Sequence, residues 1–374
     1  MTKVARCVLA LGVCLAGLQA ASTAHAHASS TDYLEVDARQ ADRMSGRWDL
    51  PVAALDWQLD LDADGDRRIT WLEIDAASAA IGTLALANLR LARGGRDCEL
   101  SVASPLALTE HLDEPHVALD WRASCAADGP LKIASGLTFG DATHRSLLTL
   151  VDARETTAAV LVPGDPAWQQ AADGTPWWRS FAAFVAQGAF HVWIGYDHLA
   201  FLLLLILPSV LVVERGHWRA AGSAKWVVRD LALIVTAFTI SHSITLALAA
   251  TQTVSLPAGP IEAAIALSIV IAGVLNLRPG WSRWRLPLAF GFGFVHGFGF
   301  ANALLELNVT GRSLVPVLAG FNIGVELAQL ALVLVSTPLL LLLARQPIYA
   351  RRLMPAMSIV TAVVGAGWLL QRLA

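Results

Sequence analysis

Four histidines and two acidic residues interrupt long apolar stretches in the second half of this sequence. Together with one asparagine they are His191, Asp197, His198, His242, His296, Asn322 and Glu326. Such side chains are expensive in hydrocarbon and mark function when a membrane span carries them. Neutral imidazoles with a few carboxylates suit nickel, cobalt, zinc or copper(II), and not magnesium or calcium. The residue types therefore indicate a transition-metal site. The alternative is that each histidine is a hydrogen-bonded packing residue.

The spacing of the first group predicts that two imidazoles lie together. His191 and His198 are seven residues apart, nearly two turns of a helix, so they share one face. Gly195 lies between them on that face and leaves room for a ligand or a neighbouring helix. We expect Asp197 to point away from this face, either toward another helix or as a support behind a histidine ligand.

Two later apolar stretches also carry a pattern. Asn322, Glu326 and Gln329 are four and three residues apart, so they form one stripe on a helix. Gly293 and Gly297 form a small-xxx-small pair beside His296, which permits a close approach to another helix.

A different kind of site is predicted at residues 62–73, where acidic residues alternate. This run matches the twelve-residue calcium loop of EF-hands, with ligands from Asp62, Asp64, Asp66, the Arg68 carbonyl, Thr70 and Glu73. Arg67 replaces the usual glycine at the sharp turn, where a side chain costs roughly 1 kcal/mol or more. We predict a weak calcium site, and the alternative is an acidic, solvated turn.

The elements that must position the first site are membrane helices. Hydrophobic residues make up 55% of the chain and charged residues 15%, well below the ~25% of soluble domains. Six apolar stretches within 179–374 are each long enough to cross ~30 Å of hydrocarbon. They are about 181–213, 230–250, 258–277, 287–305, 314–344 and 353–371. We therefore predict an all-α bundle of about six transmembrane helices.

Residues 1–26 have the pattern of a cleavable signal peptide. Lys3 and Arg6 precede a short apolar run, and Ala24-His25-Ala26 has the form of a cleavage site. The alternative is a first membrane anchor, although the apolar run is far shorter than the ~20 residues that a span needs. Residues 27–178, where acidic residues outnumber basic ones, are then exported.

Basic residues in alternate loops of the membrane half predict the orientation. They are Arg215, Arg219, Lys225, Arg229, Arg278, Arg283, Arg285, Arg345, Arg351 and Arg352, whereas the other side has only Arg312 and Arg372. The basic side is expected to be cytoplasmic, which also places residues 27–178 outside. We therefore expect a bacterial inner-membrane protein with a periplasmic domain and a polar pocket in the outer half of the bundle.

The exported domain has the pattern of short strands separated by turns. Alternation begins at Tyr33, and further candidate strands are 84–92, 98–103, 116–122, 131–139, 146–153 and 157–162. This spacing predicts a mainly-β, sandwich-like domain. Cys98 and Cys125 are expected to pair in an oxidising compartment, and the alternative is two separate buried thiols. His111, His116 and His144 have no ligand spacing and are expected on the surface.

Four motifs of the membrane half form a recognisable set. They are His191-x5-Asp197-His198, Phe238-Thr-Ile-Ser-His242-Ser-Ile-Thr-Leu, Phe294-Val-His296-Gly-Phe-Gly-Phe-Ala and Phe321-Asn322-Ile-Gly-Val-Glu326. Together they resemble the HupE/UreJ family of hydrogenase and urease accessory membrane proteins, in its longer branch with an exported domain. The resemblance implies permease-like handling of nickel or cobalt. The first motif is also similar to the His-x4-Asp-His motif of nickel/cobalt transporters, with one more residue in the spacing.

The leading hypothesis is therefore a non-enzymatic permease or accessory protein for a divalent transition metal. Its metal residues would be those of the apolar stretches, and calcium would occupy the exported loop. One alternative is an intramembrane zinc-dependent hydrolase, in which zinc activates water. Another is a receptor or scaffold that acts through the exported domain. We expect the bilayer, the metal ion, and metalloenzyme maturation or periplasmic proteins as partners, and no nucleic acid.

Overall fold

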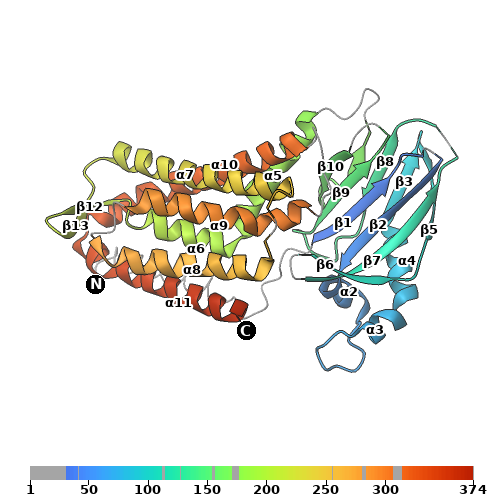
Figure 1. The fold of residues 1–374 in the computed structure, drawn as a ribbon, viewed down its shortest axis with the longest axis horizontal. Coiled ribbons are helices and arrows are strands. Elements are labelled where there is room, and N and C mark those ends of the chain that lie inside the picture. Colours follow the sequence, from blue (N-terminus) through green and yellow to red (C-terminus); the bar gives the residue numbers. More distant parts are fainter. Residues whose placement is uncertain are drawn as a thin grey trace. The chain divides into compact units, whose positions relative to one another are not determined.

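The chain folds into two compact units, each of which is described by itself (Figure 1). The computed structural model describes residues 31–373 except 41, 112–113, 127, 154–155, 171–176, 255, 280–283 and 306–313, and no side chains at 258 and 300–305. The first unit comprises residues 28–187 and 302–321, and the second comprises 188–301 and 322–374. The predicted signal peptide lies outside the described residues.

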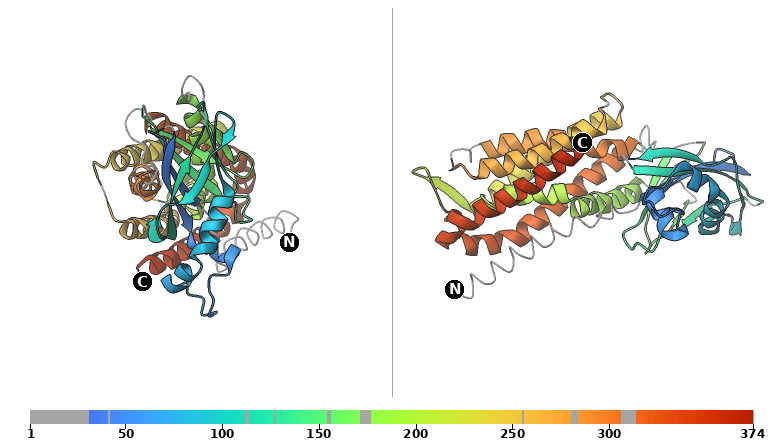
Figure 2. Two further views of the ribbon diagram at one scale, coloured as in Figure 1. Left: turned by 90° about the vertical axis from the view of Figure 1, so that its right-hand side faces the viewer. Right: turned by 90° about the horizontal axis from the view of Figure 1, so that it is seen from below.

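The first unit is built on two β-sheets (Figure 2). The larger sheet has the order β10-β9-β1-β2-β7-β5, with β6 also paired to β7, and the smaller has the order β11-β8-β3-β4. Strands β1 and β9 are parallel, and the other neighbours are antiparallel. The bounds are β1 Thr31–Asp37, β2 Arg43–Pro51, β3 Leu89–Arg93, β4 Arg96–Asp97, β5 Glu99–Val102, β6 Ala107–His111, β7 Glu114–Ser124, β8 Leu131–Ser135, β9 Arg145–Val151, β10 Thr156–Leu161 and β11 Ala167–Gln169.

One hydrophobic core joins the two sheets. Leu34 of β1 and Trp121 of β7 belong to the same buried cluster as Leu91 of β3 and Ile133 of β8. Alternate residues of β1 face this core, because successive side chains of a strand point to opposite sides. The prediction of a mainly-β, sandwich-like domain is therefore confirmed.

Three short helices lie between the strands in the described part of this unit, and one of them corrects a predicted strand. They are α2 (Val52–Leu59), α3 (Trp71–Ala76) and α4 (Ser78–Asn88). The expected strand at 84–92 is helical up to Asn88, and only β3 is extended. Residues 78–88 are rich in alanine and leucine, which are strong helix formers, and this preference prevails there over a weak alternation.

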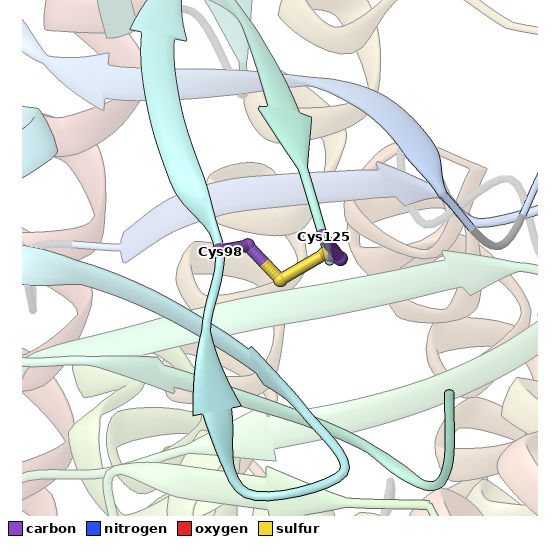
Figure 3. Close-up of a disulfide and its surroundings, with 2 residues drawn as sticks. All are labelled: Cys98 and Cys125. Carbon is purple, nitrogen blue, oxygen red and sulfur yellow. A yellow bond between two sulfur atoms is a disulfide. The ribbon is translucent and has the colours of Figure 1, made fainter. Parts of the chain in front are cut away.

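A disulfide links two neighbouring strands of the larger sheet (Figure 3). Cys98 immediately precedes β5 and Cys125 immediately follows β7, and these two strands pair antiparallel. Their α-carbons are 4.4 Å apart, a separation that a disulfide spans. The predicted pairing of the two cysteines is confirmed.

The second unit is an all-α bundle, as predicted, with a small hairpin. Its elements are α5 (Trp177–Ile194, which begins in the first unit), α6 (Tyr196–Ile206), β12 (Leu211–Glu214), β13 (His217–Ala220), α7 (Ala224–Ala250), α8 (Ala258–Asn276), α9 (Arg285–Leu305), α10 (Leu314–Ala344), a π-helix (Tyr349–Leu353) and α11 (Met354–Leu373). The end of α9 and the start of α10, within 302–321, belong to the first unit. Helices α8 and α11 lie side by side, with Gly273 against Ala362 (Figure 1).

Membrane-length helices are fewer than the six that we predicted. Among the described residues, four are long and apolar enough to cross a bilayer: Ala224–Ala250, Gly259–Asn276, Leu314–Ala344 and Tyr349–Leu373. Counting α5 and α6 as one broken span gives five. Helix α9 occupies the fourth predicted stretch but is not among these helices.

The first predicted span, 181–213, is wrong as a single straight helix. The chain bends by 75° between α5 and α6, at Gly195. The backbone of Gly195 is extended, with φ −73° and ψ 94°, so the helical hydrogen bonds are interrupted.

Helix α6 ends at Ile206, and the β12–β13 hairpin follows it. Arg215 and Gly216 have positive φ, as the tight two-residue turn of this hairpin requires.

Candidate metal sites

The break at Gly195 brings two histidines into contact. His191 lies in the last turn of α5 and His198 in the first turn of α6. Their ring centroids are 4.7 Å apart in an edge-to-face arrangement. The predicted proximity is therefore present, although it is achieved across a bend and not along one face of a straight helix.

Gly195 has no space for a side chain at this bend. A β-carbon there would lie 2.8 Å from Nδ1 of His198 and 2.9 Å from the carbonyl oxygen of His191. The Oδ1 atom of Asp197 accepts hydrogen bonds from the backbone N–H of His198 at 2.8 Å and from its Nδ1 at 2.9 Å. Asp197 thus supports the neighbouring imidazole, which is the second of the two roles expected for it.

The hydrogen bond to Asp197 determines which nitrogen of His198 can accept a metal. A carboxylate only accepts, so Nδ1 carries the proton and Nε2 has the lone pair. This Nε2 is buried and has no hydrogen-bond partner among the described residues. A metal-binding histidine has this arrangement, with its other nitrogen held by a carboxylate.

His296 on α9 has the opposite tautomer for a similar reason. Its Nε2 lies 3.2 Å from Oγ of Ser268, whose single hydrogen is donated to the carbonyl of Ile265 at 2.6 Å. Nε2 must therefore be the donor, which leaves the lone pair on Nδ1. That atom is buried and unpartnered within the described part of the chain, and the ring centroid is 5.1 Å from that of His198.

The tautomer of His242 on α7 is fixed by a residue of α10. Its Nδ1 lies 3.1 Å from Oδ1 of Asn322, an amide oxygen that only accepts, so Nε2 has the lone pair. The ring of Phe238 stacks on His242 at 6.0 Å between centroids and meets His296 edge-on at 5.3 Å. We call His191, His198, His242 and His296 the imidazole cluster.

The other residues of the α10 stripe lie apart from this cluster. Oε1 of Glu326 accepts a hydrogen bond from Thr236 at 2.8 Å, and Oε1 of Gln329 lies 3.4 Å from Oγ1 of Thr239. The stripe therefore faces α7, but only Asn322 contacts an imidazole among the contacts described. Across the described residues, the imidazoles meet in pairs and do not converge as three ligand atoms on one point.

The only such convergence in the described ranges is in the predicted calcium loop. Oxygen atoms of Asp62, Asp64 and Asp66 all lie within 4.8 Å of one another. The carboxylate of Asp62 accepts from the backbone N–H of Arg67, which has φ 65° as the sharp turn of this loop requires. The backbone N–H of Arg68 donates to Asp66 at 2.7 Å.

Glu73, the last residue of the loop, closes it onto α3. Its Oε1 accepts from the backbone N–H of Ala63, and Thr70 and Glu73 form a capping box at the start of that helix. The hydrogen bonds from Thr70 hold the pKa of the Glu73 carboxyl below its usual value. The loop thus gathers carboxylate oxygens of the kind that calcium prefers.

Three histidines of the first unit are not surface residues, which corrects our expectation. His116 and His144 are 2% exposed, and the His111 side chain is 11% exposed. Nε2 of His144 lies 2.7 Å from the fully buried Asp32, which also accepts from Ser146 and Trp48. Ser146 donates to Asp32 and not to the imidazole, so this set has no activated nucleophile. No spacing in the sequence indicates it, because its members come from three strands and a turn.

The comparisons with known proteins give a family match that covers the second unit. No curated protein matches the chain. The family model described as HupE / UreJ protein matches residues 167–372, more than half of the chain and every member of the imidazole cluster. Membership of that family indicates a role in metal transport or as an accessory protein. On this match, the protein belongs to the HupE/UreJ family.

Proposed function

We propose that this protein is a permease or accessory protein for a divalent transition metal, with nickel as the first candidate and cobalt as the second. The ion would bind at the imidazole cluster, with Asp197 and Asn322 as supporting residues. The family consists of accessory and transport proteins, so we assign no catalytic residue.

One observation carries this proposal. Three imidazoles from three helices each have their proton held by a neighbour, namely Asp197, Ser268 or Asn322. A neutral imidazole with its proton fixed on one nitrogen presents a lone pair on the other, which is how histidine binds borderline metals. Packing alone does not require buried nitrogens that lack partners, as at His198 and His296.

Equilibrium binding of nickel to the purified full-length protein tests the proposal. The wild-type protein is expected to bind nickel, and the His198→Ala/His242→Ala/His296→Ala variant to lose this binding. His217→Ala is the matched control, because His217 is exposed in the β12–β13 hairpin and, among the residues that the structure describes, hydrogen-bonds only the backbone of Arg215. Equal, weak binding by the wild type and the triple variant would contradict the metal site.

Access from the outer side is part of the proposal and has its own test. Arg219 of the β12–β13 hairpin belongs to the loops expected in the cytoplasm. A cysteine placed at this position is expected to react with a membrane-impermeant thiol reagent only after the membrane is opened. Labelling in intact cells would overturn both the orientation and the outer access.

We also propose that residues 62–73 bind calcium. The support is the approach of three carboxylates to within 4.8 Å of one another in a loop with the EF-hand ligand order. Calcium binding to the full-length protein should be lost in Asp64→Asn/Glu73→Gln. Asp75→Asn, just outside the loop, is the control, and equal calcium binding by the two variants would contradict the assignment.

A further inference from the structure

A polar seam runs between α7 and α10. Three side chains of α7, His242, Thr239 and Thr236, are paired with Asn322, Gln329 and Glu326 of α10, at 3.1, 3.4 and 2.8 Å. Both helices are otherwise long and apolar enough to cross a bilayer. The seam therefore extends the polar groups from the imidazole cluster to Thr236, over residues 236–242 of α7.

The carboxylate of Glu326 needs an explanation beyond helix packing. Hydrogen bonds between membrane helices average only about 0.6 kcal/mol, and serine or threonine can supply them. An acidic side chain near the centre of a membrane helix costs about 2.5–3.5 kcal/mol on insertion scales, far more than its bond to Thr236 returns. A role that needs the carboxylate itself would account for its presence.

Glu326 lies apart from His242 along the seam, and within the described part of the chain it belongs to no group of three converging metal-binding side chains. Its partner Thr236 lies six residues before His242 on α7, which is about 9 Å along the helix axis. Two ligands of one ion lie within about 4–5 Å of each other, because each metal–ligand bond is only about 2 Å long. The cluster and the carboxylate are therefore separate positions on one seam.

We infer that Glu326 is a second cation-binding station, which receives the divalent ion after it leaves the imidazole cluster. The carboxylate would bind the ion together with the hydroxyl of Thr236, and Thr239, which lies between Thr236 and His242 on α7, would line the path between the two stations. This inference rests on the proposed function, because it names the next position of the same ion.

Nickel binding and nickel uptake by the full-length protein in proteoliposomes separate the two stations. Glu326→Gln keeps the size of the side chain and an oxygen for Thr236, but it removes the charge. We expect this variant to bind nickel at equilibrium within about twofold of the wild type, and its uptake to fall about tenfold or more, as for the loss of a group that supports a metal site. Glu326→Asp, which keeps the carboxylate, should retain part of the uptake.

Thr337→Val is the matched control for a polar group on α10. Thr337 is 2% exposed and, within the described ranges, donates only to the carbonyl of Val333 in its own helix. We expect this variant to take up nickel like the wild type. An equal loss of uptake in Thr337→Val and Glu326→Gln would show general damage to α10 and would overturn the inference.

The remaining outcomes also decide between the two proposals. Normal uptake by Glu326→Gln, with uptake lost in His198→Ala, would overturn the second station and leave the metal permease intact. Loss of equilibrium binding in a Glu326→Gln protein that elutes as a folded species would make Glu326 a ligand of the first site, again against a second station. If Glu326→Gln does not fold, loss of uptake in a folded Glu326→Asp decides against the inference and retention decides for it. Absence of nickel uptake by the wild type would defeat the proposed function itself.

Discussion

At the residue scale, a single proton on each imidazole decides what the ring can bind. Asp197 fixes the proton of His198 on Nδ1, whereas Ser268 fixes that of His296 on Nε2. The lone pairs are therefore on different nitrogens of the two rings, although the residue type is the same. Replacing either neighbour would release the tautomer and weaken a metal site without removing a ligand.

Arg67 is a strained residue of the first unit. It has φ 65° in the predicted calcium loop, a conformation that costs a non-glycine residue roughly 1–2 kcal/mol. Arg67→Gly should therefore raise the local stability of the loop by about 1 kcal/mol, a part of the gain being offset by the entropy of glycine in the unfolded chain. Hydrogen exchange of residues 62–73 in the full-length protein measures this.

Arg68→Gly is the control for that substitution. Arg68 follows directly in the sequence but does not have positive φ, so glycine there gains nothing and should destabilise the loop by about 0.5–1 kcal/mol. Faster exchange in both variants would contradict the assignment of strain to Arg67.

Glu114 predicts a pH dependence of stability in the same unit. Burial raises the pKa of its carboxyl above the unfolded value, against the opposing charge of His116. The pKa of a glutamate in the unfolded chain is about 4.3, and below that pH the carboxyl of Glu114 is neutral in both states, so its contribution to the free energy of unfolding is fully present. This contribution is lost as the pH rises through the pKa of the folded state, because the folded protein then holds a buried charge.

Glu114→Gln should therefore stabilise the first unit at pH 7 and leave it unchanged near pH 3. Hydrogen exchange of residues 114–124 at the two pH values checks this in the full-length protein. The same gain at both pH values would show that charge is not the cause. Glu110→Gln is the control, because Glu110 is exposed on the neighbouring strand β6 and its substitution should not change the stability at either pH.

At the scale of the element, glycines let α9 lie directly against α7. A β-carbon at Gly293 would collide with Oγ of Ser241, and one at Gly297 would lie 2.5 Å from the carbonyl oxygen of His242. The predicted close approach at this small-xxx-small pair is confirmed. Because His296 is the residue before Gly297, the same approach brings its imidazole toward α7.

Gly297→Val should separate α7 from α9 and weaken nickel binding, because the two helices must move apart to admit the side chain. Overpacking of this kind costs about 1–3 kcal/mol or more. Gly291→Ala is the control on the same helix, since a β-carbon there meets nothing within 4 Å. Thermal unfolding and nickel binding of the purified protein compare the two, and equal behaviour would contradict the packing argument.

The end of helix α6 shows how neighbouring elements are held together. Its last carbonyl groups have no partners within the helix. Asn276 of α8 donates to the carbonyl of Leu204, and Arg285 of α9 donates to that of Leu205. Arg285 also pairs with Asp230 of α7 at 3.0 Å. One arginine therefore ties together the three helices that carry His198, His242 and His296.

At the scale of the whole molecule, the two units are stabilised by different means. The bundle is stabilised by contacts among apolar helices, whereas the first unit has a closed core and a disulfide. Cys98 and Cys125 are 27 residues apart, and closing a loop of that length stabilises a fold by about 3–4 kcal/mol on the chain-entropy model.

Cys98→Ser/Cys125→Ser should therefore lower the stability of the first unit by about 3–4 kcal/mol and leave the bundle unaffected. Hydrogen exchange of the full-length protein measures the stability of both units in one experiment. Nickel binding, which we assign to the bundle, should persist in this variant. A loss confined to the bundle helices would contradict the independence of the two cores.

The sequence by itself determined the division into an acidic β-rich half and an apolar helical half, the disulfide partners and the family. These follow from local patterns, because hydrophobic periodicity and length decide whether a segment is a strand or a membrane helix. It also identified Asn322 and the four imidazoles as polar groups within apolar stretches. Motif and composition sufficed for each of these predictions, because none of them depends on which distant residue a side chain contacts.

Only the tertiary structure decided the bend at Gly195, the tautomer of each imidazole, the burial of His116 and His144, and the separation of Glu326 from the cluster. Each of these depends on which groups from distant parts of the chain come within hydrogen-bond reach. Spacing along one helix fixes a face but not the neighbour that this face meets. Packing of whole helices selects that neighbour, and with it the nitrogen of each imidazole that remains available to a metal.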